Sequence, residues 1–308
     1  MTTALTPRLA LLMTVPPLLW AGNVVVGRLV VGQVPPLALN AMRWTLALLI
    51  LLPLGWRAVA TPAARAQIRA RWRTLAVLGG LGVGYYNAMQ YVALKTSTPL
   101  NITLIASSLP VWMLAVGALF HGERAGLRAQ AGAALSLAGV AVVLARGDVA
   151  NLAQVRFVPG DLMMVVAIIG WAFYSWMLAR PPASLAGERR PDWDWAAFLL
   201  VQTLFGVAWG WAFAGAEALV APAPIRWSPW LALAIVYVAV GPSVIAYRCW
   251  GLGVTRAGPA AAAFFGNLTP LFAALLSAAT LGDSPRGYHA LAFALIIAGI
   301  VVSSPRRR

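Results

Sequence analysis

The sequence predicts an all-α polytopic membrane protein, and three observations lead to that class. The 308 residues are 61% hydrophobic and only 10% charged, whereas soluble globular chains are about 25% charged. The apolar residues fall into repeated stretches of about 20 residues, the length at which a helix spans a bilayer. Lipid offers the backbone no hydrogen-bond partner, and the stretches are too long and uniform for barrel strands, so each is predicted to be a helix.

Ten stretches are predicted as spans, joined by short connections that leave no room for a soluble domain. In chain order they are 9–31, 37–56, 74–94, 98–119, 127–145, 161–180, 195–214, 229–251, 257–281 and 287–304. The first resembles a signal peptide, but its apolar run is too long and "WAGN", residues 20–23, lies in its middle. In the third, "GGLGVG", residues 79–84, lacks the GKS/T ending of a phosphate loop. This run, and the pair Gly206 and Gly210 in the seventh span, predict close helix packing.

The net charge of +15 is read as a topology signal, not as a nucleic-acid signal. With the N-terminus inside, most loop arginines face the cytoplasm, where Lys and Arg collect in membrane proteins. The expected location is a bacterial inner membrane, and the charge distribution predicts that both termini are cytoplasmic, with the lipid bilayer as a partner. The basic stretch 57–73 either only sets this topology or also lies against anionic headgroups.

The two halves of the sequence resemble each other at an offset of about 160 residues. Pro110 then matches Pro270, because "ASSLPVW", residues 106–112, aligns with "GNLTPLF", residues 266–272. "HGE", residues 121–123, aligns in the same way with "LGD". The predicted repeats are 1–147 and 160–304, followed by a basic tail at 305–308.

Five spans in each repeat would make the second copy enter the membrane from the opposite side. Inverted repeats are typical of secondary transporters, whose sites lie near the midplane beside broken helices. Pro110 and Pro270 are therefore candidate hinges for gating, and the alternative is a static kink in each span. The hinge is favoured because both repeats keep the proline.

The ten spans, the inverted repeats, "WAGN", the "SSLP" and "NLTP" prolines and the "GE" and "GD" pairs resemble the drug/metabolite transporter superfamily, in its EamA-type branch. The resemblance covers nearly the whole chain. It implies a basket of helices around a central cavity, with spans five and ten at the periphery, and it implies export of small metabolites.

Polar and aromatic side chains inside the spans are the candidate substrate-binding residues. Flat aromatic walls with a few amides suit an aromatic or neutral amino acid. For Arg43 the choice is between snorkelling to the headgroups and binding a substrate carboxylate. For the others, the alternative is hydrogen bonding or packing between helices. The set is Trp20, Asn23, Arg43, Tyr86, Gln90, Asn101, Ser107, Trp112, Trp171, Tyr174, Tyr247 and Asn267.

The acidic residues are all predicted in loops or at span ends. A proton-driven transporter commonly carries a buried acid or histidine within the membrane, so facilitated transport is favoured over proton coupling. The alternative is an exporter of another solute, such as a drug, with ion coupling. A membrane enzyme is a remote alternative that would rest on Glu123 and His121 alone. No cofactor or metal is expected, and the oligomeric state is left open, with a monomer as one option.

Overall fold

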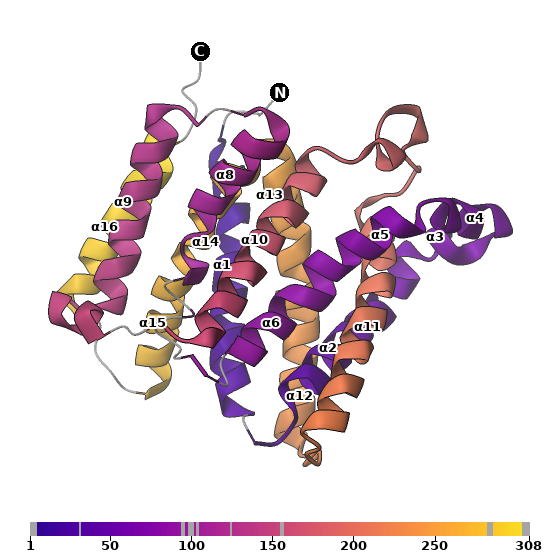
Figure 1. Ribbon diagram of the computed structural model, residues 1–308, viewed down its shortest axis with the longest axis horizontal. Coiled ribbons are helices and arrows are strands. Elements are labelled where there is room, and N and C mark those ends of the chain that lie inside the picture. The colour runs from indigo at the N-terminus through magenta and orange to yellow at the C-terminus, as the bar shows by residue number, and fades with distance from the viewer. Residues whose placement is uncertain are drawn as a thin grey trace. The chain divides into compact units, whose positions relative to one another are not determined.

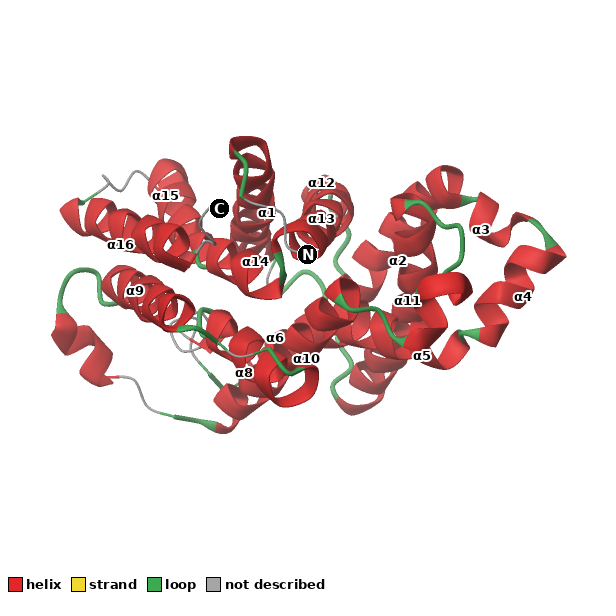
Figure 2. Ribbon diagram, turned by 90° about the horizontal axis from the view of Figure 1, so that it is seen from above, coloured by secondary structure: helices red, strands yellow, loops and turns green. Residues whose placement is uncertain are grey.

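The fold is described from a computed structural model covering residues 5–30, 32–93, 96–97, 102, 105–123, 125–154, 157–281 and 286–303. Within these ranges all regular structure is helical and no strand occurs (Figure 2), which confirms the all-α class. Seven helical stretches there are long and apolar enough to cross a membrane, beside the shorter apolar helices Leu109–His121 and Gly287–Ser303. The chain is thus a multi-span membrane protein, while ten crossings in two inverted repeats stay a prediction.

The helices follow one another in the order shown in Figure 1. The α-helices are α1 (Pro7–Leu29), α2 (Pro36–Gly55), α3 (Arg57–Ala60), α4 (Pro62–Ala70), α5 (Trp72–Gly79), α6 (Tyr86–Ala93), α8 (Leu109–His121), α9 (Leu127–Leu144), α10 (Pro159–Ala179), α11 (Trp195–Val220), α12 (Pro229–Val238), α13 (Ala246–Ala257), α14 (Pro259–Gly266), α15 (Leu268–Leu281) and α16 (Gly287–Ser303). Two segments are π-helical, η1 (Gly80–Tyr85) and η5 (Ala239–Ile245). Three are 3₁₀-helical, η2 (Val149–Gln154), η3 (Ala183–Leu185) and η4 (Gly187–Arg189).

The chain divides into two compact units, and each unit combines segments from both halves of the sequence. Unit 1 comprises Met1–Val25, Val92–Ala179 and Cys249–Arg308, and unit 2 comprises Val26–Tyr91 and Arg180–Arg248. The boundaries fall inside α1, α6 and α13, so each of these helices belongs partly to both units.

In unit 1, α9 and α16 lie side by side (Figures 1 and 2) and approach each other at glycines. A Cβ atom on Gly132 would lie 2.7 Å from the carbonyl oxygen of Gly299, and one on Gly299 would lie 2.7 Å from that of Gly132. A Cβ on Gly139 would lie 2.8 Å from the carbonyl oxygen of Ala292. Because lipid removes the hydrophobic drive between helices, small residues that allow backbones to approach hold such pairs together.

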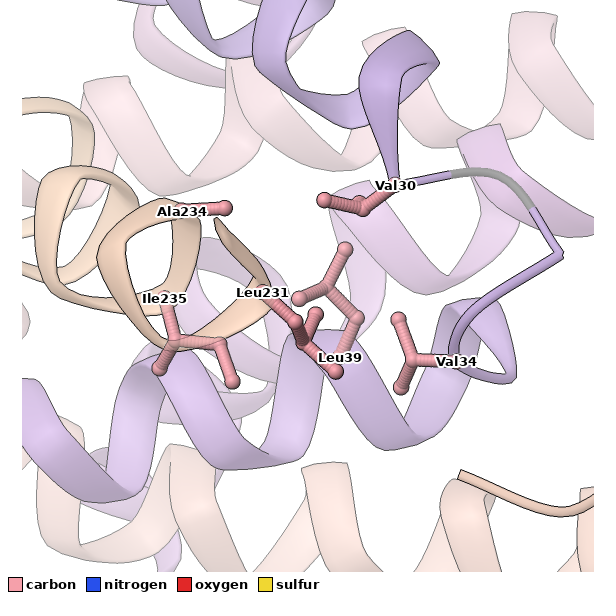
Figure 3. Packing of buried hydrophobic residues seen from close by; sticks show 6 residues of the cluster. All are labelled: Val30, Val34, Leu39, Leu231, Ala234 and Ile235. Atoms are coloured by element: carbon pink, nitrogen blue, oxygen red, sulfur yellow. The ribbon is translucent and has the colours of Figure 1, made fainter. Parts of the chain in front are cut away.

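In unit 2, α12 packs against the end of α1 and the start of α2 through a buried aliphatic cluster (Figure 3). The cluster consists of Val30, Val34, Leu39, Leu231, Ala234 and Ile235. Further along α2, α11 packs against it, and the indole N–H of Trp211 donates to Thr45 Oγ at 3.0 Å.

The closest helix approach in unit 2 joins α11 to α5 and η1 at glycines. A Cβ on Gly206 would overlap the side chain of Val83 and lie 2.9 Å from the carbonyl oxygen of Gly79. A Cβ on Gly210 would lie 3.6 Å from Ala41 Cα, which is ordinary contact. The close packing predicted for the glycine run is confirmed, and Gly206 is the tighter member of the pair.

The two π-helical segments occupy related places in the two halves of the sequence. Their first residues, Gly80 and Ala239, are separated by nearly the same offset as Pro110 and Pro270. Helix α11 contacts η1, and α2 contacts η5. Each π segment therefore has the same kind of neighbour, and such segments occur frequently at functional sites.

The structure corrects the prediction that Pro110 and Pro270 interrupt helix interiors. Pro110 is the second residue of α8, and Pro270 is the third residue of α15. The chain breaks just before each helix, where the N–H groups of Ser108 and Asn267 donate three residues back, at 3.0 and 3.2 Å. First-turn N–H groups have no partner within their own helix, so neither proline removes a helical hydrogen bond.

Candidate functional site

Unit 1 gathers three tryptophans from three helices into one aromatic cluster. The ring centroid of Trp20 on α1 lies 5.6 Å from that of Trp171 on α10 and 5.3 Å from that of Trp250 on α13. Trp171 and Trp250 lie 5.7 Å apart, and Tyr174 lies 5.0 Å from Trp171. These spacings are those of favourable aromatic pairs. The structure thus brings together three of the predicted residues, Trp20, Trp171 and Tyr174.

The members of this cluster differ in exposure. The buried rings fill the interior of the unit, whereas a partly exposed ring can also contact a solute. Trp171, Tyr174 and Trp250 are buried, whereas Trp20 is partly exposed. The indole N–H of Trp250 donates to Ser175 Oγ at 3.2 Å, which fixes the plane of its ring. Trp20 is therefore the member with indole surface left to offer a solute.

Trp250 is absent from the predicted set, although it lies within the predicted span 229–251. The helix continues to Ala257, so Trp250 lies well inside it. A tryptophan one residue from a predicted span end is typical of an interfacial anchor, and nothing in the sequence distinguished the two cases.

Unit 2 holds a buried polar cluster around Arg43 on α2. Arg43 is only 1% exposed, which excludes snorkelling to the headgroups. Its Nε donates to Ser243 Oγ in η5 at 3.2 Å, and its guanidinium carbon lies 5.3 Å from the ring centroid of Trp44. Trp44 in turn meets Tyr247 edge to face at 4.8 Å, and the Tyr247 hydroxyl donates to the carbonyl of Gly82 in η1.

The acceptor for Arg43, Ser243, directly follows Pro242 inside the π segment η5. The hydroxyl of Ser243 donates to the carbonyl of Val238 at 2.8 Å, and its oxygen accepts from Arg43. The backbone one turn earlier therefore holds Ser243 while it accepts from the guanidinium.

Three buried polar groups of unit 2 have no hydrogen-bond partner among the described residues. They are both amide atoms of Asn40, the indole N–H of Trp44 and the hydroxyl of Thr203. Asn40 and Trp44 are each 1% exposed and lie four residues apart on α2, so they share a face with Arg43. Buried polar groups are usually paired, so two such groups on one helix face are unusual.

The other predicted residues differ in burial and in their hydrogen-bond partners. Asn23, Tyr86, Gln90 and Trp112 are partly buried and Ser107 is buried, while Asn101 lies outside the described residues. The Trp112 indole N–H donates to Ser108 Oγ at 3.1 Å. The Asn267 amide donates to Ser136 Oγ on α9 at 2.8 Å, which is the helix–helix bond considered as an alternative for each residue.

Two acidic residues are buried, and both serve helix N-termini. Asp161, in the first turn of α10, accepts from the Ser97 hydroxyl and from the Val158 N–H. Glu217, near the end of α11, accepts from the N–H of Leu37 at the start of α2, at 2.9 Å. These carboxylates stabilise helix starts, where backbone N–H groups are unsatisfied.

Glu123 and His121, on which an enzymatic function would rest, lie at the C-terminal end of α8. Glu123 is exposed, and the His121 ring stacks on Trp176 with centroids 4.5 Å apart. Within the described ranges, no three His, Cys, Asp or Glu side chains are grouped so that they could hold a metal ion.

Comparison with known proteins places these features in a transporter context. The sequence matches the EamA-like transporter family over residues 8–145 and 158–304. An uncharacterized transporter of Archaeoglobus fulgidus is 26% identical over 299 residues, 96% of this chain and 97% of the relative. The aromatic amino acid exporter YddG of Ancylobacter novellus is 28% identical over 274 residues, 89% of each chain.

Two further matches cover nearly the whole chain. The uncharacterized inner membrane transporter YedA of Escherichia coli is 24% identical over 290 residues, 92% of this chain and 87% of the relative. A solved crystal structure matches with a TM-score of 0.75 and 25% identity, covering 96% of each chain.

Proposed function

The chain belongs to the EamA-like transporter family, and from this premise we propose that it exports aromatic and other neutral amino acids by alternating access. The family resemblance predicted from the sequence is confirmed, and the relatives it matches are transporters, which agrees with a non-enzymatic role. The bacterial relatives named as inner membrane proteins support the same location here. The protein lies in the lipid bilayer, and its substrate is a small molecule.

The observation that carries the substrate class is the aromatic cluster of Trp20, Trp171, Trp250 and Tyr174 in unit 1. Indole faces bind planar apolar groups by stacking, and a partly exposed member gives a solute access to such a face. The exporter YddG, 28% identical to this chain, supports the same class.

The proposed architecture is a pair of inverted five-helix repeats, 1–147 and 160–304, around a central cavity, with the basic tail 305–308 and both termini in the cytoplasm. The matching offsets of η1 with η5 and of the breaks before α8 and α15 support this repeat. Each half then carries one π segment and one proline-marked break.

The proposed mechanism is facilitated, because the buried acids Asp161 and Glu217 lie at helix ends and are used as caps. Uptake into vesicles tests both the substrate and the mechanism. We expect radiolabelled tryptophan and phenylalanine to enter vesicles that contain the protein faster than empty vesicles. Collapsing a pH gradient should leave the equilibrium level of uptake unchanged.

Two results of this experiment would contradict the proposal. If tryptophan, phenylalanine and threonine all crossed no faster than in empty vesicles, the substrate class would be wrong. A gradient-dependent overshoot would instead favour the ion-coupled alternative, in which another solute is exported.

The breaks before Pro110 and Pro270 are proposed as hinges. Alanine at either position supplies the missing N–H and allows the preceding helical turn to run on into the next helix. We therefore expect Pro110→Ala and Pro270→Ala to slow transport several-fold while changing substrate binding little. Pro229, which begins α12 with no helix running into it, is the matched control, and its alanine variant should transport normally. Equal losses of binding and transport would indicate a static kink.

A further inference from the structure

We infer that the face of α2 formed by Asn40, Arg43 and Trp44 binds the carboxylate of the exported solute, which would make a free carboxylate a requirement for transport. The inference rests on the proposed function and deepens it, because it names the group by which substrates are selected. All three residues and their partners belong to unit 2.

A buried arginine in a membrane span is the first reason. Arg43 is the eighth residue of the 20-residue helix α2 and is 1% exposed. Charged groups at such depth are unfavourable in lipid, and they are generally retained where a substrate or ion uses them. A guanidinium presents a planar fork of N–H donors that matches the two oxygens of a carboxylate.

The second reason is that two hydrogen-bond donors beside Arg43 have no partner among the described residues. The amide of Asn40 and the indole N–H of Trp44 have no partner among the described residues, and both are buried. They lie on the face of α2 that carries Arg43, at helical spacings of three and four residues. An anion placed on this face would accept from the amide, the indole and the guanidinium together.

The third reason is that the guanidinium is oriented before any ligand arrives. Ser243 accepts from Nε at 3.2 Å and is itself fixed by its bond to the Val238 carbonyl at 2.8 Å. The bond at Nε limits the orientations that the plane of the guanidinium can adopt. Preorganised donors of this kind bind an anion without the entropy loss of ordering a long side chain.

The other half of the sequence shows that the fold does not need this charge. The offset of 159 that relates η1 to η5 and α2 to α11 places Gln202 at the position of Arg43, and Gly84 at that of Ser243. Helix α11 contacts η1 as α2 contacts η5, yet that crossing carries no arginine. Helices can therefore pack against a π segment in this way without a buried arginine.

The carboxylate site is covered in this structure by aromatic rings. Trp44 lies against the guanidinium, and Tyr247 meets Trp44 edge to face at 4.8 Å. Binding therefore requires Tyr247 to move away from Trp44, whose indole N–H stays in the site as a donor. We expect the carboxylate to form charge-assisted hydrogen bonds with the arginine.

Binding to the purified full-length protein in detergent, measured by calorimetry, tests the inference with three probes. L-Tryptophan has both charged groups, indole-3-pyruvate keeps only the carboxylate, and tryptamine keeps only the ammonium. We expect the first two to bind and tryptamine to bind at least about tenfold more weakly, as loss of a charged hydrogen-bond partner predicts. Arg43→Gln should weaken binding of indole-3-pyruvate about tenfold to a hundredfold and leave that of tryptamine unchanged.

Two further variants show whether the effect of Arg43→Gln comes from the carboxylate site. One changes a second residue of the site, and the other removes a different arginine. Asn40→Leu keeps a similar volume, removes both orphan atoms and should weaken only the probes that have a carboxylate. Arg248→Gln is the matched control, because Arg248 is another arginine within a span of unit 2, with its guanidinium carbon 4.9 Å from the Trp195 ring. Its variant should bind all three probes as the wild type does.

Several outcomes would overturn the inference. Tryptamine that binds as tightly as tryptophan, or no binding of either carboxylate probe, would do so. So would an Arg43→Gln variant that loses all three probes equally. An Asn40→Leu variant that becomes more stable with unchanged carboxylate preference would indicate a buried water only. If indole-3-pyruvate binds through Arg43 while vesicles transport no amino acid, the proposed substrate fails and the carboxylate site stands.

Discussion

Replacing Gly206 by alanine is expected to lower the thermal stability of the protein in detergent, whereas the same change at Gly210 is expected to preserve or raise it. A Cβ at Gly206 would overlap Val83 and lie 2.9 Å from the Gly79 carbonyl oxygen, but one at Gly210 would make an ordinary contact at 3.6 Å. Both variants share the intrinsic preference of helices for alanine, about 1 kcal/mol. Overpacking adds a cost of about 1–3 kcal/mol at Gly206 alone.

A double variant identifies the clash directly. Val83→Gly removes both Val83 atoms that the new Cβ would overlap, Cγ1 and Cβ, so it should restore part of the stability lost in Gly206→Ala. The two changes are in contact and are expected to be non-additive. Thermal unfolding of the two single variants, the double variant and Gly210→Ala completes the comparison. Equal stabilities of the two alanine variants would refute the assignment of α11, α5 and η1 as the tightest crossing.

Substitutions in the aromatic cluster are expected to separate stability from transport. Trp171 is buried and its ring meets Trp20, Trp250 and Tyr174, so Trp171→Ala leaves a large cavity. The expected loss is about 3–5 kcal/mol of unfolding free energy, as for other buried tryptophans. Trp20 is partly exposed, so Trp20→Ala should lose less stability and still reduce transport about tenfold or more.

The phenylalanine variants supply the control for this comparison. Trp171→Phe and Trp20→Phe keep a flat ring for stacking and should retain most of the stability and transport. The measurements are thermal unfolding in detergent and the initial rate of tryptophan uptake at equal amounts of folded protein. Normal uptake by Trp20→Ala would show that the cluster only packs the interior of unit 1.

Much of the fold follows from residue patterns that act locally. Apolar runs of spanning length predicted the helices, and the glycines at 79–84 and 206 predicted a close crossing that the structure contains. These signals are readable because lipid forces the backbone into helices and because only glycine permits such an approach.

The parts that were missed depend on contacts between distant residues. The π segments η1 and η5 change the helical register without a distinct sequence signal. Trp250 lay within its predicted span, and only its contacts with Trp20 and Trp171 identify it as a member of the aromatic cluster. The orphan amide of Asn40 is a property of its surroundings, since the residue type alone predicts only a buried polar group.

The interleaving of the two units has a consequence for biogenesis. Ser243 lies 200 residues after Arg43 in the chain. At about 5–20 residues per second of synthesis, the arginine is made roughly 10–40 s before its acceptor exists. Neither half of the nascent chain contains a whole unit, so final packing waits for the last third of the protein.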